Sequence, residues 1–116
     1  MPNTSIGAQR AWVTRKVNDL NLHVDNLYTV FQSMDVTFAR NELGEAKALA
    51  LDMYTYAQDR GLGFTTDHKS VLEVIKQRMK EVQRWIMRQN ITDLLPTVRD
   101  IIEIIVGLLA LIAILL

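Results

Sequence analysis

The chain has 116 residues, of which 49% are hydrophobic, and its 13 basic and 13 acidic side chains give a formal net charge of zero. This length is enough for one small domain. The absence of cysteine excludes disulfides, thiolate zinc sites and cysteine nucleophiles, and the two histidines, His23 and His68, are too few for a histidine metal cluster.

The first predicted element is a long helix over residues 6–40. Its apolar residues recur at alternating steps of three and four positions, which is the heptad pattern of a helix packed against partner helices. This heptad face consists of Val17, Leu20, Val24, Leu27, Phe31, Met34 and Phe38. Because the face is very apolar for an isolated chain, we expect it to be an oligomer contact between copies of the protein.

Two shorter helices are predicted next. The segment 41–44 ends in Gly44 and is typical of a turn, and a second helix over 45–60 follows, with small residues on its apolar face. Such a helix can pack closely against the first as an antiparallel hairpin. Thr65 and its neighbours are capping residues for a third helix over 66–89. Residues 1–90 are therefore expected to form an all-α body with coiled-coil-like packing.

The third predicted helix carries a row of basic residues at four-residue spacing. We call this the basic row, and it consists of Lys76, Lys80, Arg84 and Arg88. Next to a membrane it would face anionic lipid headgroups. Two alternatives are the phosphates of a nucleic acid and a solvated surface with Glu73 and Glu81 as partners. The zero net charge of the whole chain argues against nucleic acid.

Residues 91–97 form a predicted joint, and residues 98–116 form a predicted C-terminal hydrophobic helix. From Ile101 onward its only charged residue is Glu103. A helix over 98–116 would be about 28 Å long, against a hydrocarbon core of about 30 Å. We therefore expect a transmembrane anchor, with burial between protein copies or within a domain as the alternatives.

One face of this last helix combines Glu103 with three small residues, Gly107, Ala110 and Ala113. Small residues let helices approach closely within lipid, so these four residues are the predicted membrane-helix contact face. Glu103 either belongs to a proton or ion pathway or pairs with Arg99 one turn earlier, at the depth of the membrane interface.

These features predict a protein that is not an enzyme. No combination of acid, base and nucleophile is present, and no metal or phosphate motif, so we expect no catalytic or metal site, no cofactor and no small-molecule substrate. The favoured function is a membrane-associated structural or scaffold protein that self-assembles as a homo-oligomer. A coat component of a virus-like particle and a tail-anchored adaptor both fit this description. The alternative is a small, holin-like oligomeric pore with Glu103 on its contact or pore face.

The expected location is a membrane. Three arginines lie near the N-terminal end of the predicted anchor: Arg84, Arg88 and Arg99. By the positive-inside tendency, they predict that the N-terminal body lies on the cytoplasmic or particle-interior side.

Overall fold

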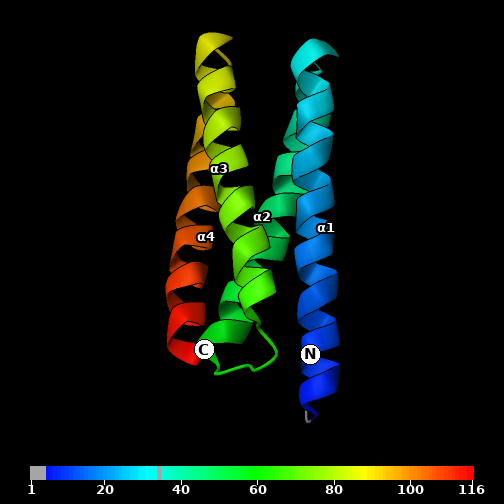
Figure 1. The fold of residues 1–116 in the computed structure, drawn as a ribbon. Helices are drawn as coiled ribbons and strands as arrows, with labels where there is room; N and C mark the ends of the chain where they lie inside the picture. Colours follow the sequence, from blue (N-terminus) through cyan, green and yellow to red (C-terminus); the bar gives the residue numbers. More distant parts are fainter. Residues whose placement is uncertain (1–4, 34) are drawn as a thin grey trace.

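The computed structural model describes residues 5–33 and 35–116, which form four α-helices and one short 3-10 helix. Helix α1 is Ile6–Ser33, α2 is Val36–Gln58 and α3 is Thr66–Arg88, and the 3-10 helix η1 (Thr92–Leu94) leads directly into α4 (Leu95–Leu115). These residues contain no strand, so the all-α prediction is confirmed. The helices form an elongated bundle of 45 × 20 × 20 Å (Figure 1).

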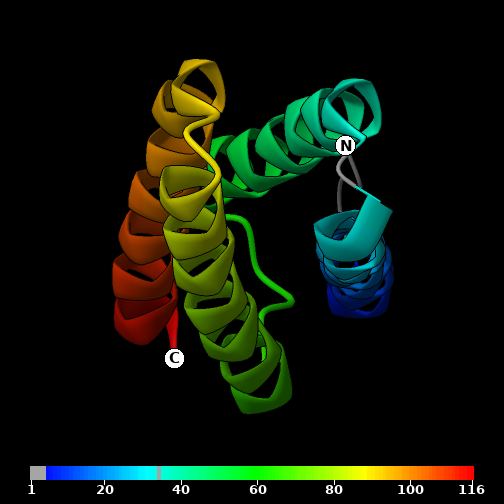
Figure 2. The ribbon, with the colours of Figure 1, turned by 90° about the horizontal axis from the view of Figure 1, so that it is seen from above.

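The four helices occupy the corners of the bundle in the order α1, α2, α4, α3. Helix α1 packs against α2 and α3, and α4 packs against the same two helices. Consecutive helices run in opposite directions, so α1 is parallel to α3 and α2 is parallel to α4 (Figure 1, Figure 2). The bundle therefore consists of two helical hairpins, α1–α2 and α3–α4, joined by residues 59–65 at one end.

The end of α1 and the start of α2 differ from the predicted helix over 6–40. Helix α1 ends at Ser33 and α2 begins at Val36, so the predicted turn at 41–44 is corrected: these residues lie inside α2. Asp35 caps α2, because its carboxylate accepts a hydrogen bond from the backbone N–H of Phe38 at 2.9 Å. The second helix thus starts nine residues earlier than the predicted 45–60.

The start of α3 agrees with the capping residues in the sequence. The hydroxyl of Thr65 accepts a hydrogen bond from the backbone N–H of His68, and the backbone N–H of Thr65 donates to Nδ1 of His68 at 3.0 Å. This reciprocal pair is a capping box. The structure ends α3 at Arg88, one residue before the predicted end at 89.

The loop over residues 59–65 is held against the beginning of α1. The Tyr56 hydroxyl lies 2.6 Å from Oε1 of Gln9 and 2.9 Å from the carbonyl oxygen of Leu62, both of which can accept its hydrogen. Gly63 has φ +98°, and a Cβ atom there would lie 2.6 Å from the backbone of Gln9 and Arg10. Only glycine fits this point, where the loop touches α1.

The buried positions of parallel helices are separated by a constant number of residues. Each core residue of α1 has a buried counterpart 55 positions later in α3, and α2 and α4 show the same separation. The α1/α3 pairs are Val17/Leu72, Leu20/Ile75, Val24/Met79 and Leu27/Val82. The α2/α4 pairs are Leu43/Val98, Ala46/Ile101, Ala50/Ile105, Met53/Leu108 and Ala57/Ile112. At three of these levels, alanine on α2 leaves room for isoleucine on α4, so a small residue faces a large one across the core.

Helix α4 belongs to this core, and the predicted membrane-spanning helix over 98–116 is not supported. Within the described ranges, no helix combines the length and the apolar character needed to cross a membrane. Every stretch of 18 residues in α4 includes Arg99, Asp100 and Glu103. The helix also begins before the predicted position 98, at Leu95, with Pro96 in its first turn, where the missing N–H costs no hydrogen bond.

Candidate functional site

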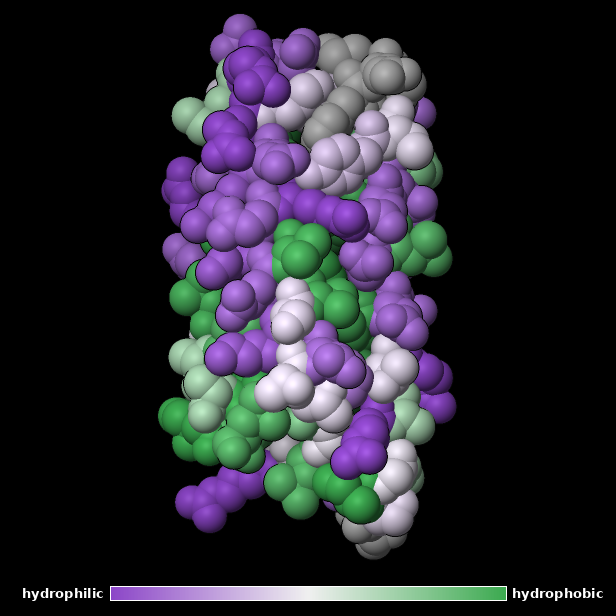
Figure 3. Space-filling view, in the orientation of Figure 1, coloured by the Kyte–Doolittle hydropathy of each residue, from purple (hydrophilic) through white to green (hydrophobic). Residues whose placement is uncertain are grey.

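The side of α4 that faces away from the bundle is apolar along its C-terminal half. We call Glu103, Val106, Ala110, Ala113 and Ile114 the α4 outer face. Val106 is 49% exposed and Ile114 is 80% exposed, and residues 104–116 carry no polar side chain. In Figure 3 apolar surface gathers at the lower left, where Figure 1 shows the C-terminal half of α4.

Three residues of the predicted membrane-helix contact face, Glu103, Ala110 and Ala113, lie exposed on the α4 outer face. The fourth, Gly107, is half-buried against α2, and a Cβ atom there would lie 2.9 Å from Cε2 of the Tyr54 ring. Gly107 therefore permits the close approach of two helices of the same chain. The carboxylate of Glu103 forms no ion pair with any described residue, so the predicted pairing with Arg99 is not formed.

One flank of α3 is occupied by polar contacts to α1. Arg78 forms an ion pair with Asp25 and donates a hydrogen bond to Oδ1 of Asn21 at 3.2 Å. The hydroxyl of Tyr28 donates to Oε2 of Glu81 at 2.5 Å. These contacts place Arg78 and Glu81 on the α1 side of α3, and Glu81 is used there rather than as a partner of the basic row.

The basic row lies on the other flank of α3. Two residues correspond to about 200° of rotation around an α-helix, so Lys76 and Lys80, each two positions from Arg78, lie on the side of α3 that faces α4. Lys76 and Lys80 are half-buried, and Arg84 and Arg88 are exposed. Within the described part of the chain, none of the four forms an ion pair.

The apolar residues of the α4 outer face extend toward this basic row. Ile104 lies on the α2 side of α4, together with Asp100 and Gly107. Val106 follows Ile104 by two positions and therefore lies on the α3 side of the helix. The basic row and the α4 outer face thus lie on the same exposed side of the α3–α4 hairpin. Because the two helices are antiparallel, Lys76 and Lys80 are the members of the row nearest the apolar residues, whereas Arg84 and Arg88 lie beside the start of α4.

The predicted oligomer contact through the heptad face is corrected. Four of its residues are at most 2% exposed and belong to the core of the chain itself: Val17, Leu20, Val24 and Leu27. Their packing partners are the neighbouring helices of the same bundle. Phe38 belongs to α2 and is 37% exposed, while Met34 and the side chain of Phe31 lie outside the described residues.

Sequence reasoning missed the ion pairs that join α2 to η1 and to α4. Arg40 pairs with Asp93 at 2.5 Å and Lys47 pairs with Asp100 at 3.1 Å. Both pairs have a separation of 53 residues and they lie one heptad apart, as expected for parallel helices in constant register. The available signal was two basic residues seven positions apart in one segment and two acidic residues seven positions apart in the other. This signal has meaning only once the two segments are known to be parallel neighbours.

The two histidines lie in separate helix contacts. Nδ1 of His68 accepts a hydrogen bond from the backbone N–H of Thr65, so the neutral ring carries its proton on Nε2, which donates to Oγ1 of Thr14 at 2.8 Å. Burial lowers the pKa of His68 below its usual 6.5. Nδ1 of His23 lies 2.5 Å from a carboxylate oxygen of Glu42, between α1 and α2. Among the described residues, no three acidic or histidine side chains are grouped as a metal site.

Comparison with known proteins found no matching family model, no matching curated protein and no matching solved structure.

Proposed function

We propose that the protein is a non-enzymatic structural protein that associates with the surface of an anionic membrane through the exposed face of the α3–α4 hairpin. The observation that carries this proposal is that the α4 outer face and the basic row lie on the same exposed side of the α3–α4 hairpin, with Lys76 and Lys80 nearest the apolar residues. In this arrangement α4 stays in the bundle and lies along the membrane interface, as amphipathic helices of peripheral proteins do.

The apolar part of the face supplies the first contribution. Ile114 is 80% exposed and Val106 is 49% exposed. Transfer of these side chains and the adjacent alanines from water into the interface is favourable by about 2–4 kcal/mol. That contribution alone is too small for stable attachment, because part of it is offset by the freedom that the protein loses on binding.

The basic row supplies the second contribution. A lysine or arginine close to an anionic surface contributes about 1 kcal/mol, so four of them provide a term comparable to the apolar one. Stable attachment generally requires two such signals together. Because the basic row forms no ion pair with described residues, it is available for lipid headgroups.

Glu103 opposes this association, because its carboxylate lies on the same face as the apolar residues. We therefore expect Glu103→Gln to strengthen binding to anionic vesicles. The predicted oligomeric pore requires the opposite, since there the carboxylate contributes to function. No observation on residues 5–33 and 35–116 favours the pore.

Co-sedimentation with vesicles tests the proposal. The protein should bind vesicles of phosphatidylcholine mixed with phosphatidylglycerol and should bind pure phosphatidylcholine at least about tenfold more weakly. Added salt should weaken binding, because it screens exposed charges. Equal binding to both vesicle types, or no binding to either, would refute the proposal.

Matched variants locate the contact. The double variant Lys80→Glu with Arg84→Glu should lower vesicle affinity by at least about tenfold, whereas Arg15→Glu, at an exposed position of α1, should have little effect. For the apolar term, Ile114→Asp is compared with Leu22→Asp, whose parent side chain is 56% exposed on α1. If the α1 variants reduce binding as much as the α3–α4 variants, the contact lies elsewhere.

The scaffold role and the location belong to the same proposal. Anionic lipids are concentrated in the cytoplasmic leaflet, so attachment there matches the predicted side of the N-terminal body. Self-assembly, in a particle coat or as an adaptor, would then take place between membrane-bound copies. Mass measurement of the protein with and without anionic vesicles, after crosslinking, tests this: oligomers are expected on the vesicles.

A further inference from the structure

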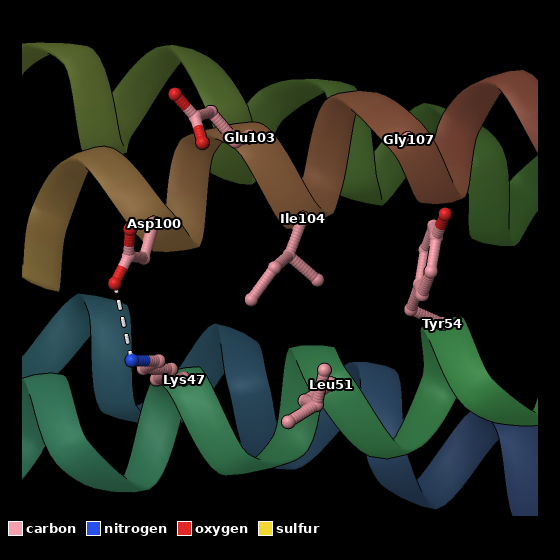
Figure 4. A pocket seen from close by; sticks show the side chains of 7 residues that line it. All are labelled: Lys47, Leu51, Tyr54, Asp100, Glu103, Ile104 and Gly107. Carbon is pink, nitrogen blue, oxygen red and sulfur yellow. Dashed lines mark hydrogen bonds and ion pairs between the residues drawn. The ribbon is translucent and has the colours of Figure 1, made fainter.

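A pocket of about 310 Å3 opens on the surface between α2 and α4, on the flank of α4 that faces away from the basic row. Its lining comes from three residues of α2 and four residues of α4. Figure 4 shows Asp100, Ile104 and Gly107 opposite the α2 residues, whereas the Glu103 side chain lies at the rim and points away from α2. The volume lies at the lower end of the range typical of small-molecule sites. None of its α2 residues was predicted from the sequence to belong to a binding site.

The pocket exists because the α2–α4 contact changes character along the groove. At one end the ion pair of Lys47 and Asp100 closes the space between the helices, with 3.1 Å between Nζ and Oδ2. One heptad further along both helices, the corresponding pair is Tyr54 and Gly107. Because Gly107 has no side chain, the groove stays open at this level. The Tyr54 ring lies against Gly107 and forms the other end wall (Figure 4).

The floor between these two ends is apolar. Leu51 and Ile104, again separated by 53 residues, lie between the ion pair and the tyrosine. Leu51 is 47% exposed although it lies in a recess. A ligand that covers this floor would gain the transfer free energy of two partly exposed aliphatic side chains.

The charged groups around the pocket select the sign of the ligand's charge. Lys47 is paired with Asp100, so their charges offset each other, whereas Glu103 at the rim forms no ion pair with a described residue. One positive and two negative groups leave a net charge of −1. The face of the Tyr54 ring adds a surface that attracts cations.

We propose that this pocket binds a small organic monocation: an ammonium group on a short apolar stem. The stem covers Leu51 and Ile104, and the ammonium group lies between the acidic rim and the tyrosine ring. This proposal shares only Glu103 with the membrane association proposed above, because Lys47, Leu51 and Tyr54 belong to α2 and lie on the side of α4 away from the basic row.

Hexyltrimethylammonium is a suitable cationic probe. Hexanoate and hexanol serve as controls with a similar apolar stem, because hexanoate is negatively charged and hexanol is uncharged. Titration monitored by heteronuclear NMR should shift the resonances of Leu51, Tyr54 and Ile104 saturably with the cation. We expect the affinity for hexanoate to be at least about tenfold lower. Equal affinity for hexanoate, or shifts spread over the whole bundle, would overturn the proposal.

Three variants distinguish ligand binding from a structural role. Lys47→Gln changes the net charge of the pocket to −2 and should tighten cation binding about fivefold, whereas Asp100→Asn changes it to zero and should weaken binding by a similar factor. Both remove the same ion pair, so a purely structural effect would move them in the same direction and overturn the charge argument. Leu51→Trp fills the recess and should abolish binding, with urea denaturation confirming that the variant folds.

Choline headgroups of lipids carry the same ammonium chemistry as free amines, and vesicles separate the two sources. If hexyltrimethylammonium displaces the protein from pure phosphatidylcholine vesicles, the headgroup is a ligand of the pocket. If the probe binds without such displacement, the pocket takes free amines. The Leu51→Trp variant separates the two proposals. If it loses probe binding but still binds anionic vesicles, the pocket has been blocked while the membrane face remains intact.

Discussion

Alanine substitution at two glycines, Gly63 and Gly44, should change stability in opposite directions. At Gly63 the backbone has φ +98°, a conformation that costs a residue with a Cβ atom about 1–2 kcal/mol. The new Cβ would also lie 2.6 Å from backbone atoms of Gln9 and Arg10. Helix backbone cannot move aside as a flexible side chain can, and such overpacking costs about 1–3 kcal/mol. Gly63→Ala should therefore lower the free energy of unfolding by about 2–5 kcal/mol.

At Gly44 the same substitution should be favourable. The residue lies inside α2, it does not have a positive φ, and no heavy atom lies within 4 Å of the position of a new Cβ. Alanine restricts the unfolded chain and favours the helix, so Gly44→Ala should raise the free energy of unfolding by about 0.5–1 kcal/mol.

Urea denaturation followed by far-UV circular dichroism measures both changes, and thermal unfolding provides a second readout. For a domain of this size, 1 kcal/mol corresponds to a change in Tm of about 4 °C. A Gly63→Ala variant with unchanged stability would refute the packing of the 59–65 loop on α1. A destabilised Gly44→Ala variant would place residue 44 in a turn, as the sequence pattern predicts, and would refute the start of α2 at Val36.

Three further predictions concern buried or bonded polar groups. The lowered pKa of His68 means that the folded state disfavours the protonated ring. The contribution of the neutral His68 ring to stability is therefore complete above pH 6.5 and is lost as the pH falls from there toward the folded-state pKa. In urea denaturation, His68→Gln should reduce this acid sensitivity, and an unchanged pH profile would contradict the prediction. Burial, together with the hydrogen bond to Glu81, raises the pKa of Tyr28 to about 12. A spectrophotometric titration should therefore show one tyrosine that ionises at higher pH than the others, and Glu81→Gln should move its pKa toward 10.0. The contribution of the protonated Tyr28 hydroxyl to stability is present below pH 10 and is lost as the pH rises toward 12. Tyr56→Phe removes the hydroxyl that joins α2 to the loop and should cost about 1–2 kcal/mol, whereas Tyr54→Phe, used as the control, should have a smaller effect.

The sequence predicts α3 closely because its boundary signals are local. Thr65 and the glycines before it act within a few residues, and α3 begins at Thr66. At the boundary between α1 and α2 the capping residue Asp35 is the one local signal, and it is easily overlooked because neither glycine nor proline occurs between Phe31 and Arg40. The apolar spacing continues through this region to Phe38, so periodicity alone predicts one long helix where the chain forms a hairpin.

The environment of α4 follows from the fold rather than from the helix itself. An apolar helix of this kind packs equally well against lipid or against a matching protein surface, and its own sequence does not distinguish the two. The matching surface is α2, whose small residues Ala46 and Ala50 lie at the levels of Ile101 and Ile105. In the same way, the basic row is visible in the sequence, but its position on the same exposed side as the α4 outer face follows only from the contacts of Arg78, which turn the other flank of α3 toward α1.

The shared 55-residue separation has a consequence for the order of folding. Each hairpin forms through contacts that are close in sequence, but both parallel contacts require the second hairpin to dock on the first. Closing a segment of this length costs about 3.5 kcal/mol of chain entropy. Once α1 and α3 meet in register, α2 and α4 are already aligned, and their contact requires no further closure. Docking should therefore be a single cooperative step, and hydrogen exchange should show the innermost amides of all four helices opening together.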